Sequence, residues 1–139
     1  LRHGMTSEFH GHSGLDVRSR STAADMARAL ASADHAGSGL RGILREIGMR
    51  DAKGKTIKGH PTRVLAKTGT LNFVSGLAGF ICPPNGRDLA FAIFTADVPR
   101  REAIPFDERE GPPGLHPWLN RARGLQGQLI NRWADLYTA

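Results

Sequence analysis

The chain has 139 residues, of which 40% are apolar and 23% charged, a balance typical of a globular domain rather than of a disordered segment. Its formal net charge is +6, but the basic residues are scattered, aromatic residues make up 6%, and no groove-reading or base-stacking motif is present. We therefore expect no nucleic-acid partner. Cys82 is the single cysteine, which excludes an internal disulfide, and no apolar run approaches the ~18 residues that span a bilayer.

The first half of the chain contains two stretches with helical spacing. Apolar residues recur at i, i+3, i+4 and i+7 over residues 23–30, and Thr22 just before them is of a type that caps helix N-termini. The same spacing recurs over residues 40–47, and Gly48 follows where a helix would end. These patterns predict two amphipathic helices.

Three strand-like runs follow, over residues 63–70, 75–81 and 89–96. The connections between them are short, and residues 83–86 (Pro-Pro-Asn-Gly) are a strong turn signal. Short connections favour antiparallel pairing of neighbouring strands. The sequence therefore predicts an antiparallel meander.

The last part of the chain divides into a loop and a helix. Residues 97–117 hold five prolines and almost no periodicity, which predicts a surface loop. After them, seven residues form one helical face: Ala122, Leu125, Leu129, Ile130, Trp133, Leu136 and Tyr137. We interpret this as a structural C-terminal helix, in which Trp133 and Tyr137 pack into the core.

The segment with the clearest chemistry is Lys67-Thr68-Gly69-Thr70, at the end of the first strand-like run. In a strand, Lys67 and Gly69 share one face, whereas Thr68 and Thr70 share the other. Gly69 has no Cβ, so a ligand can approach the backbone closely there. An ammonium, two hydroxyls and backbone N–H groups together suit a carboxylate.

These four residues, with the following Leu-Asn-Phe-Val-Ser-Gly-Leu-Ala-Gly-Phe-Ile, resemble the third signature of the serine penicillin-recognising enzymes. Among those enzymes, the segment is most similar to the D-alanyl-D-alanine carboxypeptidase/endopeptidase family of low-molecular-mass penicillin-binding proteins, peptidase family S13. A second patch, His12-Ser13-Gly14-Leu15, resembles that family's Asp-(Gly/His)-Ser-Gly-Leu segment, with Gly11 at the aspartate position. The resemblance runs from about residue 10 to the end of the chain.

The resemblance implies an α+β fold, the C-terminal part of the β-lactamase/transpeptidase-like fold, with helices packed on an antiparallel sheet. It also implies that Lys67 and Thr70 are catalytic, Lys67 through its charge and Thr70 through an oxyanion-hole N–H. Thr68, Gly69 and Thr70 would bind substrate, and Ser13 and Gly14 would line the site or form a structural turn. The implied substrate is a peptidoglycan peptide ending in D-Ala-D-Ala, with β-lactams as inhibitors, no cofactor, and a periplasmic or other extracytoplasmic location.

The other two signatures of this enzyme class, Ser-x-x-Lys and Ser-x-Asn, are missing. None of the seven serines is followed by lysine three places later or by asparagine two places later. We therefore expect residues 1–139 to be the C-terminal portion of the domain, inactive alone, with the nucleophile upstream of Leu1. Two alternatives stay open: a β-lactamase- or esterase-like relative, and a non-catalytic basic binding remnant.

A metal site near the start of the chain is the remaining possibility. His3, His10 and His12 cluster there, and a His-x-His pair on a strand would direct both rings one way. The nearest carboxylates are Glu8 and Asp16, and no cysteine is close. We expect no metal centre.

Overall fold

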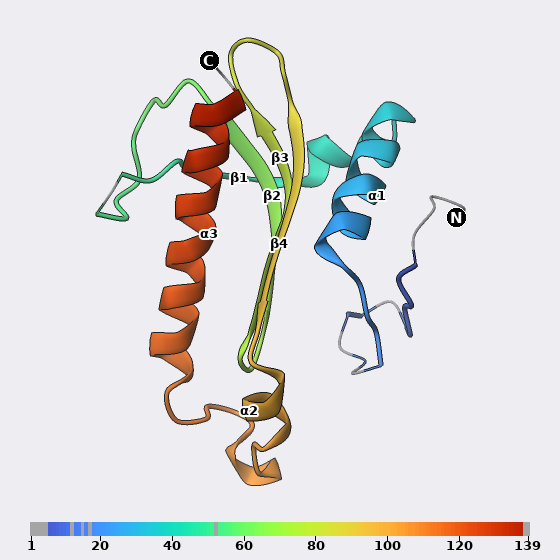
Figure 1. The fold of residues 1–139 in the computed structure, drawn as a ribbon, viewed down its shortest axis with the longest axis vertical. Coiled ribbons are helices and arrows are strands. Elements are labelled where there is room, and N and C mark those ends of the chain that lie inside the picture. The colour runs from blue at the N-terminus through green and yellow to red at the C-terminus, as the bar shows by residue number, and fades with distance from the viewer. Residues whose placement is uncertain (1–5, 12, 15, 17, 52, 138–139) are drawn as a thin grey trace.

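The computed structural model describes residues 6–137, apart from residues 12, 15, 17 and 52. Its centre is a four-stranded antiparallel sheet in the order β1-β2-β3-β4, formed by β1 (Arg45–Ile47), β2 (Arg63–Leu71), β3 (Val74–Cys82) and β4 (Leu89–Ala96). Helix α1 (Ala23–His35) lies on one face of the sheet and α3 (Leu115–Tyr137) on the other (Figure 1). The predicted α+β arrangement, helices packed on an antiparallel sheet, is confirmed.

The three predicted strands are present, and each end agrees to within one residue. A turn of two residues, Asn72 and Phe73, joins β2 to β3, so Leu71 pairs with Val74 and Thr70 with Ser75. Phe73 has a left-handed φ of 53°, which is unusual for a bulky residue, and is almost completely buried. Its ring makes a T-shaped contact with Trp118, at the start of α3, with the ring centroids 5.9 Å apart.

The main core lies between the sheet and α3. Strand residues of alternating position, among them Val64, Ala66, Leu77 and Ile81, are buried against Ile130 and its neighbours on the helix. Burying an aliphatic side chain of this size contributes about 1.5–3 kcal/mol. This packing fixes α3 across the face that also carries the side chains of Thr68 and Thr70.

Helix α1 begins as predicted. The Thr22 hydroxyl accepts a hydrogen bond from the Asp25 backbone N–H at 3.0 Å, which caps the first turn. The Asp25 side chain is 2% exposed and accepts hydrogen bonds from the hydroxyls of Thr6 and Ser7, both at 2.9 Å. Asp25 therefore attaches the N-terminal segment to α1, which packs on β4 and β3.

The predicted helix over residues 40–47 is wrong. Residues Leu40–Ile43 form a 3-10 turn, η1, and the chain then extends at Leu44 into β1, whose three residues pair with residues 64–66 of β2. Ile43, one of the four apolar residues in the helical pattern, is 82% exposed. Hydrogen bonding to the edge of β2 therefore outweighed the local helical spacing.

The C-terminal region also differs from the prediction. Residues 97–117 contain two short helices, α2 (Val98–Glu102) and the 3-10 turn η2 (Phe106–Glu108), and α3 already begins at Leu115. The buried stripe of α3 is Leu119, Ala122, Gln126, Ile130 and Ala134. Trp133 packs beside the core as predicted, whereas Tyr137 is 53% exposed, so its assignment to the core is wrong. Among the described residues, no helix is long and apolar enough to cross a membrane.

Candidate functional site

The outer edge of β2 is paired over only part of its length. Strand β1 pairs with residues 64–66, and β3 pairs with the whole of β2 from its other side. From Lys67 to Leu71, no strand within the described part of the chain pairs with the outer edge. The Lys-Thr-Gly-Thr segment therefore has a free edge, as an extended peptide would require for strand addition.

The direction of the backbone groups along this edge follows from the hairpin. Because only two residues separate Leu71 from Val74, these residues exchange both backbone hydrogen bonds, and the bonding direction then alternates along β2. The N–H and C=O groups of Thr68 and Thr70 consequently point away from β3, toward the outer edge. The Thr70 N–H is thus available to a group lying along β2.

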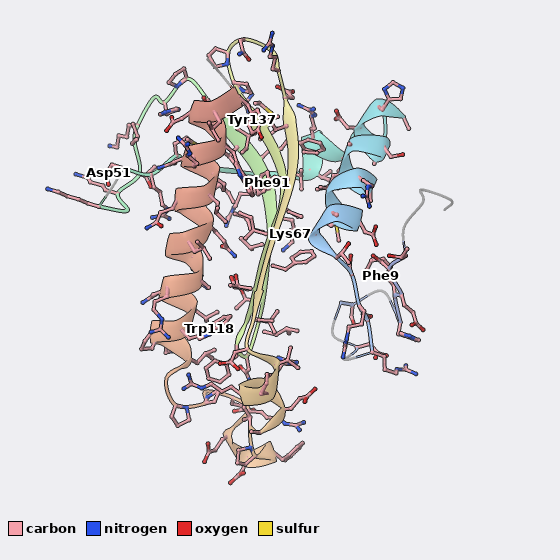
Figure 2. All side chains as sticks on the ribbon, viewed as in Figure 1. Phe9, Asp51, Lys67, Phe91, Trp118 and Tyr137 are labelled. Atoms are coloured by element: carbon pink, nitrogen blue, oxygen red, sulfur yellow. The ribbon has the colours of Figure 1, made fainter. Side chains whose placement is uncertain are left out.

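Lys67 and the threonines leave the strand on opposite faces. Thr68 and Thr70 follow buried Val64 and Ala66 on the face that packs against α3, and Lys67 lies on the α1 side of the sheet (Figure 2). The Lys67 ammonium bends back to the outer edge, where Nζ donates to the Thr68 carbonyl oxygen at 2.6 Å. A ligand carboxylate at that edge would compete for the same ammonium.

A cavity of about 640 Å³ adjoins this edge, between β2, the region of β1 and α3. Its lining includes the whole predicted binding segment except Gly69, and α3 contributes Arg123 and Gln126. Gly69 faces open space, since a Cβ placed on it would meet no atom within 4 Å. The structure therefore brings Lys67, Thr68 and Thr70 to one concave site that α3 completes.

A buried polar contact fixes α3 beside Thr70. Gln126 Nε2 donates to Ser75 Oγ at 3.0 Å, and both side chains are buried. Ser75 is the cross-strand partner of Thr70, and its backbone carbonyl also accepts from the Thr95 hydroxyl at 3.2 Å. Sequence reasoning missed Gln126, although a glutamine in an otherwise apolar helical stripe was a usable signal.

The cavity is electropositive. Among its described lining residues, four carry positive charge: Arg45, Arg50, Lys67 and Arg123. Glu46 is the one acidic residue there, and its carboxylate pairs with Arg63 at 2.8 Å. An anionic ligand is therefore favoured over a cationic one.

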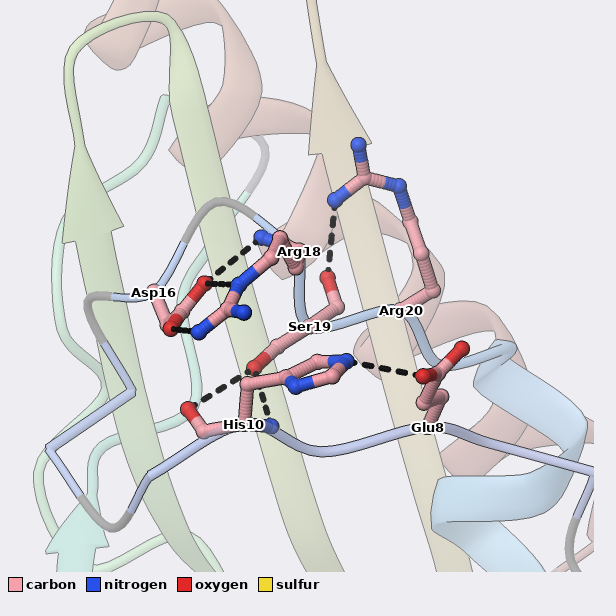
Figure 3. Close-up of polar contacts among 6 residues, drawn as sticks. All are labelled: Glu8, His10, Asp16, Arg18, Ser19 and Arg20. Carbon is pink, nitrogen blue, oxygen red and sulfur yellow. Dashed lines mark hydrogen bonds and ion pairs between the residues drawn. The ribbon is translucent and has the colours of Figure 1, made fainter.

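The N-terminal patch lies apart from this cavity. Ser13 and Gly14 are exposed and do not line it, and Gly14 has a left-handed φ of 72°, typical of a turn. Close to them, Arg18 forms a bidentate pair with Asp16, which lowers the pKa of that carboxyl to about 2 (Figure 3). A role for Ser13 and Gly14 in the site stays a prediction.

The metal question concerns the same patch. His10 pairs with Glu8 at 2.8 Å, with Ser19 also close to it (Figure 3), whereas His3 and His12 lie outside the described residues. Within the described part of the chain, no group of three or more His, Cys, Asp or Glu residues is placed to hold a metal ion.

Comparison with protein-family models matches residues 6–111 to the D-Ala-D-Ala carboxypeptidase 3 (S13) family. The matched residues include the complete sheet and end before α3 begins, so Arg123 and Gln126 lie outside them. Comparisons with curated proteins and with solved structures each gave no match.

Proposed function

Because this chain belongs to the D-Ala-D-Ala carboxypeptidase 3 (S13) family, we propose that it supplies the substrate-binding strand of a serine-type D-Ala-D-Ala carboxypeptidase. The substrate would be a peptidoglycan stem peptide outside the cytoplasmic membrane, where members of this family generally act, and β-lactams would be inhibitors. The observation that carries the proposal is the outer edge of β2 at residues 67–70, which no described strand pairs with and which lies beside an electropositive cavity.

The substrate peptide adds to β2 as a further strand. Its scissile carbonyl then lies near the outward N–H of Thr70, which serves as one donor of the oxyanion hole. Removing one such donor typically costs about 3 kcal/mol of transition-state stabilisation. Gly69 keeps the α1 face of the strand open beside Lys67, since it has no side chain there.

The covalent steps are those of acyl transfer. A serine Oγ attacks the carbonyl carbon of the D-Ala-D-Ala bond, the C–N bond breaks, and the departing D-alanine amine takes up a proton. Water then hydrolyses the acyl-enzyme ester and releases the shortened peptide. In this proposal the serine lies N-terminal to the present residues, because none of the seven serines has the Ser-x-x-Lys spacing.

Lys67 supplies positive charge at the free edge. Its ammonium contacts the Thr68 carbonyl oxygen, so binding of an anionic substrate exchanges that contact for a charge-assisted one. The same charge lowers the pKa of neighbouring acidic groups, which favours the ionised form of a nucleophile or its base. Thr68 and Thr70 orient the substrate carboxylate through their hydroxyls.

Labelling with a fluorescent penicillin tests the proposal. We expect the full-length protein to form a stable acyl-enzyme, Lys67→Ala to label at least about tenfold more slowly, and residues 1–139 alone to remain unlabelled. Acylation of residues 1–139 alone would show that the nucleophile lies within this chain. Lys58→Ala is the matched control, because it removes the same charge from an exposed loop residue that does not line the cavity.

Turnover distinguishes a carboxypeptidase from a β-lactamase-like relative. We expect the full-length protein to release D-alanine from a D-Ala-D-Ala peptide in repeated turnovers, while β-lactams acylate it with slow release. Faster steady-state hydrolysis of a chromogenic cephalosporin than of the peptide would overturn the proposed substrate.

A further inference from the structure

Arg123 lies on the one stripe of α3 that faces the cavity. The helix contributes Arg123, Gln126, Gly127, Ile130 and Asn131 to the lining, which are spaced i, i+3, i+4, i+7 and i+8. Arg121, two positions earlier, projects from the opposite side of the helix and does not line the cavity. Residues 123 and 121 therefore form a natural pair of test and control arginines.

The position of Arg123 along the length of the sheet is fixed by two contacts of α3, one before Arg123 in the helix and one after it. Trp118 packs against Phe73 at the hairpin turn, and Gln126 bonds to Ser75, the cross-strand partner of Thr70. Arg123 lies between these two contacts, one helical turn before Gln126. This places its backbone near the Thr70 end of β2 and on the face that carries the Thr68 and Thr70 hydroxyls.

The side chains of Arg123, Thr68 and Thr70 have no hydrogen-bond or ion-pair partner among the described residues, although all three line the same cavity. Two other cations of the lining are engaged: Arg50 donates to the Gly54 carbonyl oxygen, and Lys67 to that of Thr68.

Arg45 also lacks such a partner, but it occupies a different position. It stands opposite Ala66 on β1, on the far side of Thr68 from Thr70. The available cation at the Thr70 end of the cavity is thus Arg123.

We propose that Arg123 determines substrate specificity by binding the terminal carboxylate of the substrate. A guanidinium presents parallel N–H donors that match both oxygens of a carboxylate, and the two hydroxyls can donate to the remaining lone pairs. Lys67 comes from the other face of β2, and its ammonium, which lies at the strand edge, adds positive charge to the same site. This inference rests on the proposed function, because it identifies the part of a D-Ala-D-Ala peptide that this cavity receives.

The first test changes the charge of both partners. In the full-length protein, kcat/KM is measured for an acylated peptide ending in D-Ala-D-Ala and for the same peptide as its C-terminal amide. We expect Arg123→Leu to lower kcat/KM for the acid about 10- to 100-fold and to change it less than about twofold for the amide. Arg123→Lys keeps the charge but loses the paired geometry, and should fall between leucine and the native residue.

Arg121→Leu is the matched control, since it removes the same charge from the same helix and should affect neither substrate. Equal losses by Arg123→Leu on the acid and the amide would reduce Arg123 to a structural role and overturn the proposal. Equal effects of Arg121→Leu and Arg123→Leu on kcat/KM would also overturn the proposal. The same holds if Arg45→Leu, but not Arg123→Leu, lowers kcat/KM selectively for the acid.

A binding measurement separates this inference from the proposed function. Calorimetry with acetyl-D-alanine and with its amide needs no turnover. We expect the native protein to bind the acid more tightly, and Arg123→Leu to abolish that preference. If the protein does not cleave D-Ala-D-Ala peptides but shows this Arg123-dependent preference, the carboxylate site stands and the proposed function fails. If it cleaves them and Arg123→Leu binds and cleaves normally, the function stands and the carboxylate site fails.

Discussion

Replacing Gly69 by alanine should separate stability from activity. A Cβ at this position meets no atom within 4 Å, and the backbone does not have a left-handed φ. Glycine in a strand is destabilising by roughly 0.5–1 kcal/mol relative to alanine. We therefore expect Gly69→Ala to leave the melting temperature unchanged or to raise it by about 2–5 °C for a domain of this size.

Activity should change in the opposite direction. The added methyl group would lie on the α1 face of β2, next to Lys67 and close to the edge where the proposed substrate strand lies. Displacement of a reacting group by about 1 Å can cost roughly 100-fold in rate. We expect acylation of the full-length protein by fluorescent penicillin to slow at least about tenfold.

Two neighbouring glycines supply the controls. Gly76 is the cross-strand partner of Gly69 and lines the cavity from β3, away from the outer edge of β2. A Cβ there makes an ordinary contact of 3.5 Å with the Phe94 ring, so Gly76→Ala should retain both stability and acylation. A Cβ at Gly79 lies 2.6 Å from the Ala66 Cα, and also runs into the Leu65 carbonyl oxygen. Gly79→Ala must displace backbone, and we expect a loss of about 1–3 kcal/mol or more.

Thermal denaturation and the rate of penicillin labelling, measured on the same preparations, decide between these outcomes. If Gly69→Ala labels as fast as the native protein, the substrate does not lie against this part of the edge. If it melts as low as Gly79→Ala, the space beside Gly69 is not open.

Three further predictions concern the stability of the fold and the reactivity of Cys82. Thr22→Ala removes the hydroxyl that caps α1, and urea denaturation should show a free energy of unfolding lower by about 0.5–2 kcal/mol. Thr22→Ser keeps a capping hydroxyl and should retain most of the stability; equal losses in the two variants would exclude a capping effect. Hydrogen bonds from the hydroxyls of Ser7 and Thr6 lower the pKa of Asp25 in the folded protein. The ionised carboxylate therefore stabilises the fold fully at pH values above the unfolded-state pKa of about 3.9. This stabilisation is lost as the pH falls through the lower pKa of the folded state. Urea denaturation between pH 2 and 7 should show this loss in the native protein and a smaller one in Asp25→Asn; identical pH profiles would contradict the assignment. Burial is the largest cause that raises the pKa of the Cys82 thiol, and the charge of Asp88 is the next. Alkylation of Cys82 should therefore reach half its maximal rate at a pH above ~8.5, the pKa of a free cysteine. A midpoint at or below that pH would contradict the raised pKa.

Local sequence patterns were sufficient to predict the secondary structure of elements that bury one face. The alternating runs at 63–70, 75–81 and 89–96 became β2, β3 and β4, and short connections made them antiparallel. Thr22 capped α1 because that hydrogen bond closes within one turn of the chain. Side-chain alternation along a strand also assigned Lys67 and the two threonines to opposite faces of β2, as they are in the structure.

Other features depended on contacts between distant parts of the chain. Residues 45–47 became a strand because the edge of β2 offered hydrogen bonds that outweighed a helical spacing, and this pairing stops at Ala66. The cavity exists because α3 crosses the sheet beside that free edge, at a level set by the Gln126–Ser75 bond. Arg123 is 53 residues from Thr70 in the sequence, and no local pattern relates the two. The sequence alone determined the strand and the faces of its side chains, whereas tertiary packing decided which edge of β2 has no partner strand among the described residues and which cations share its cavity.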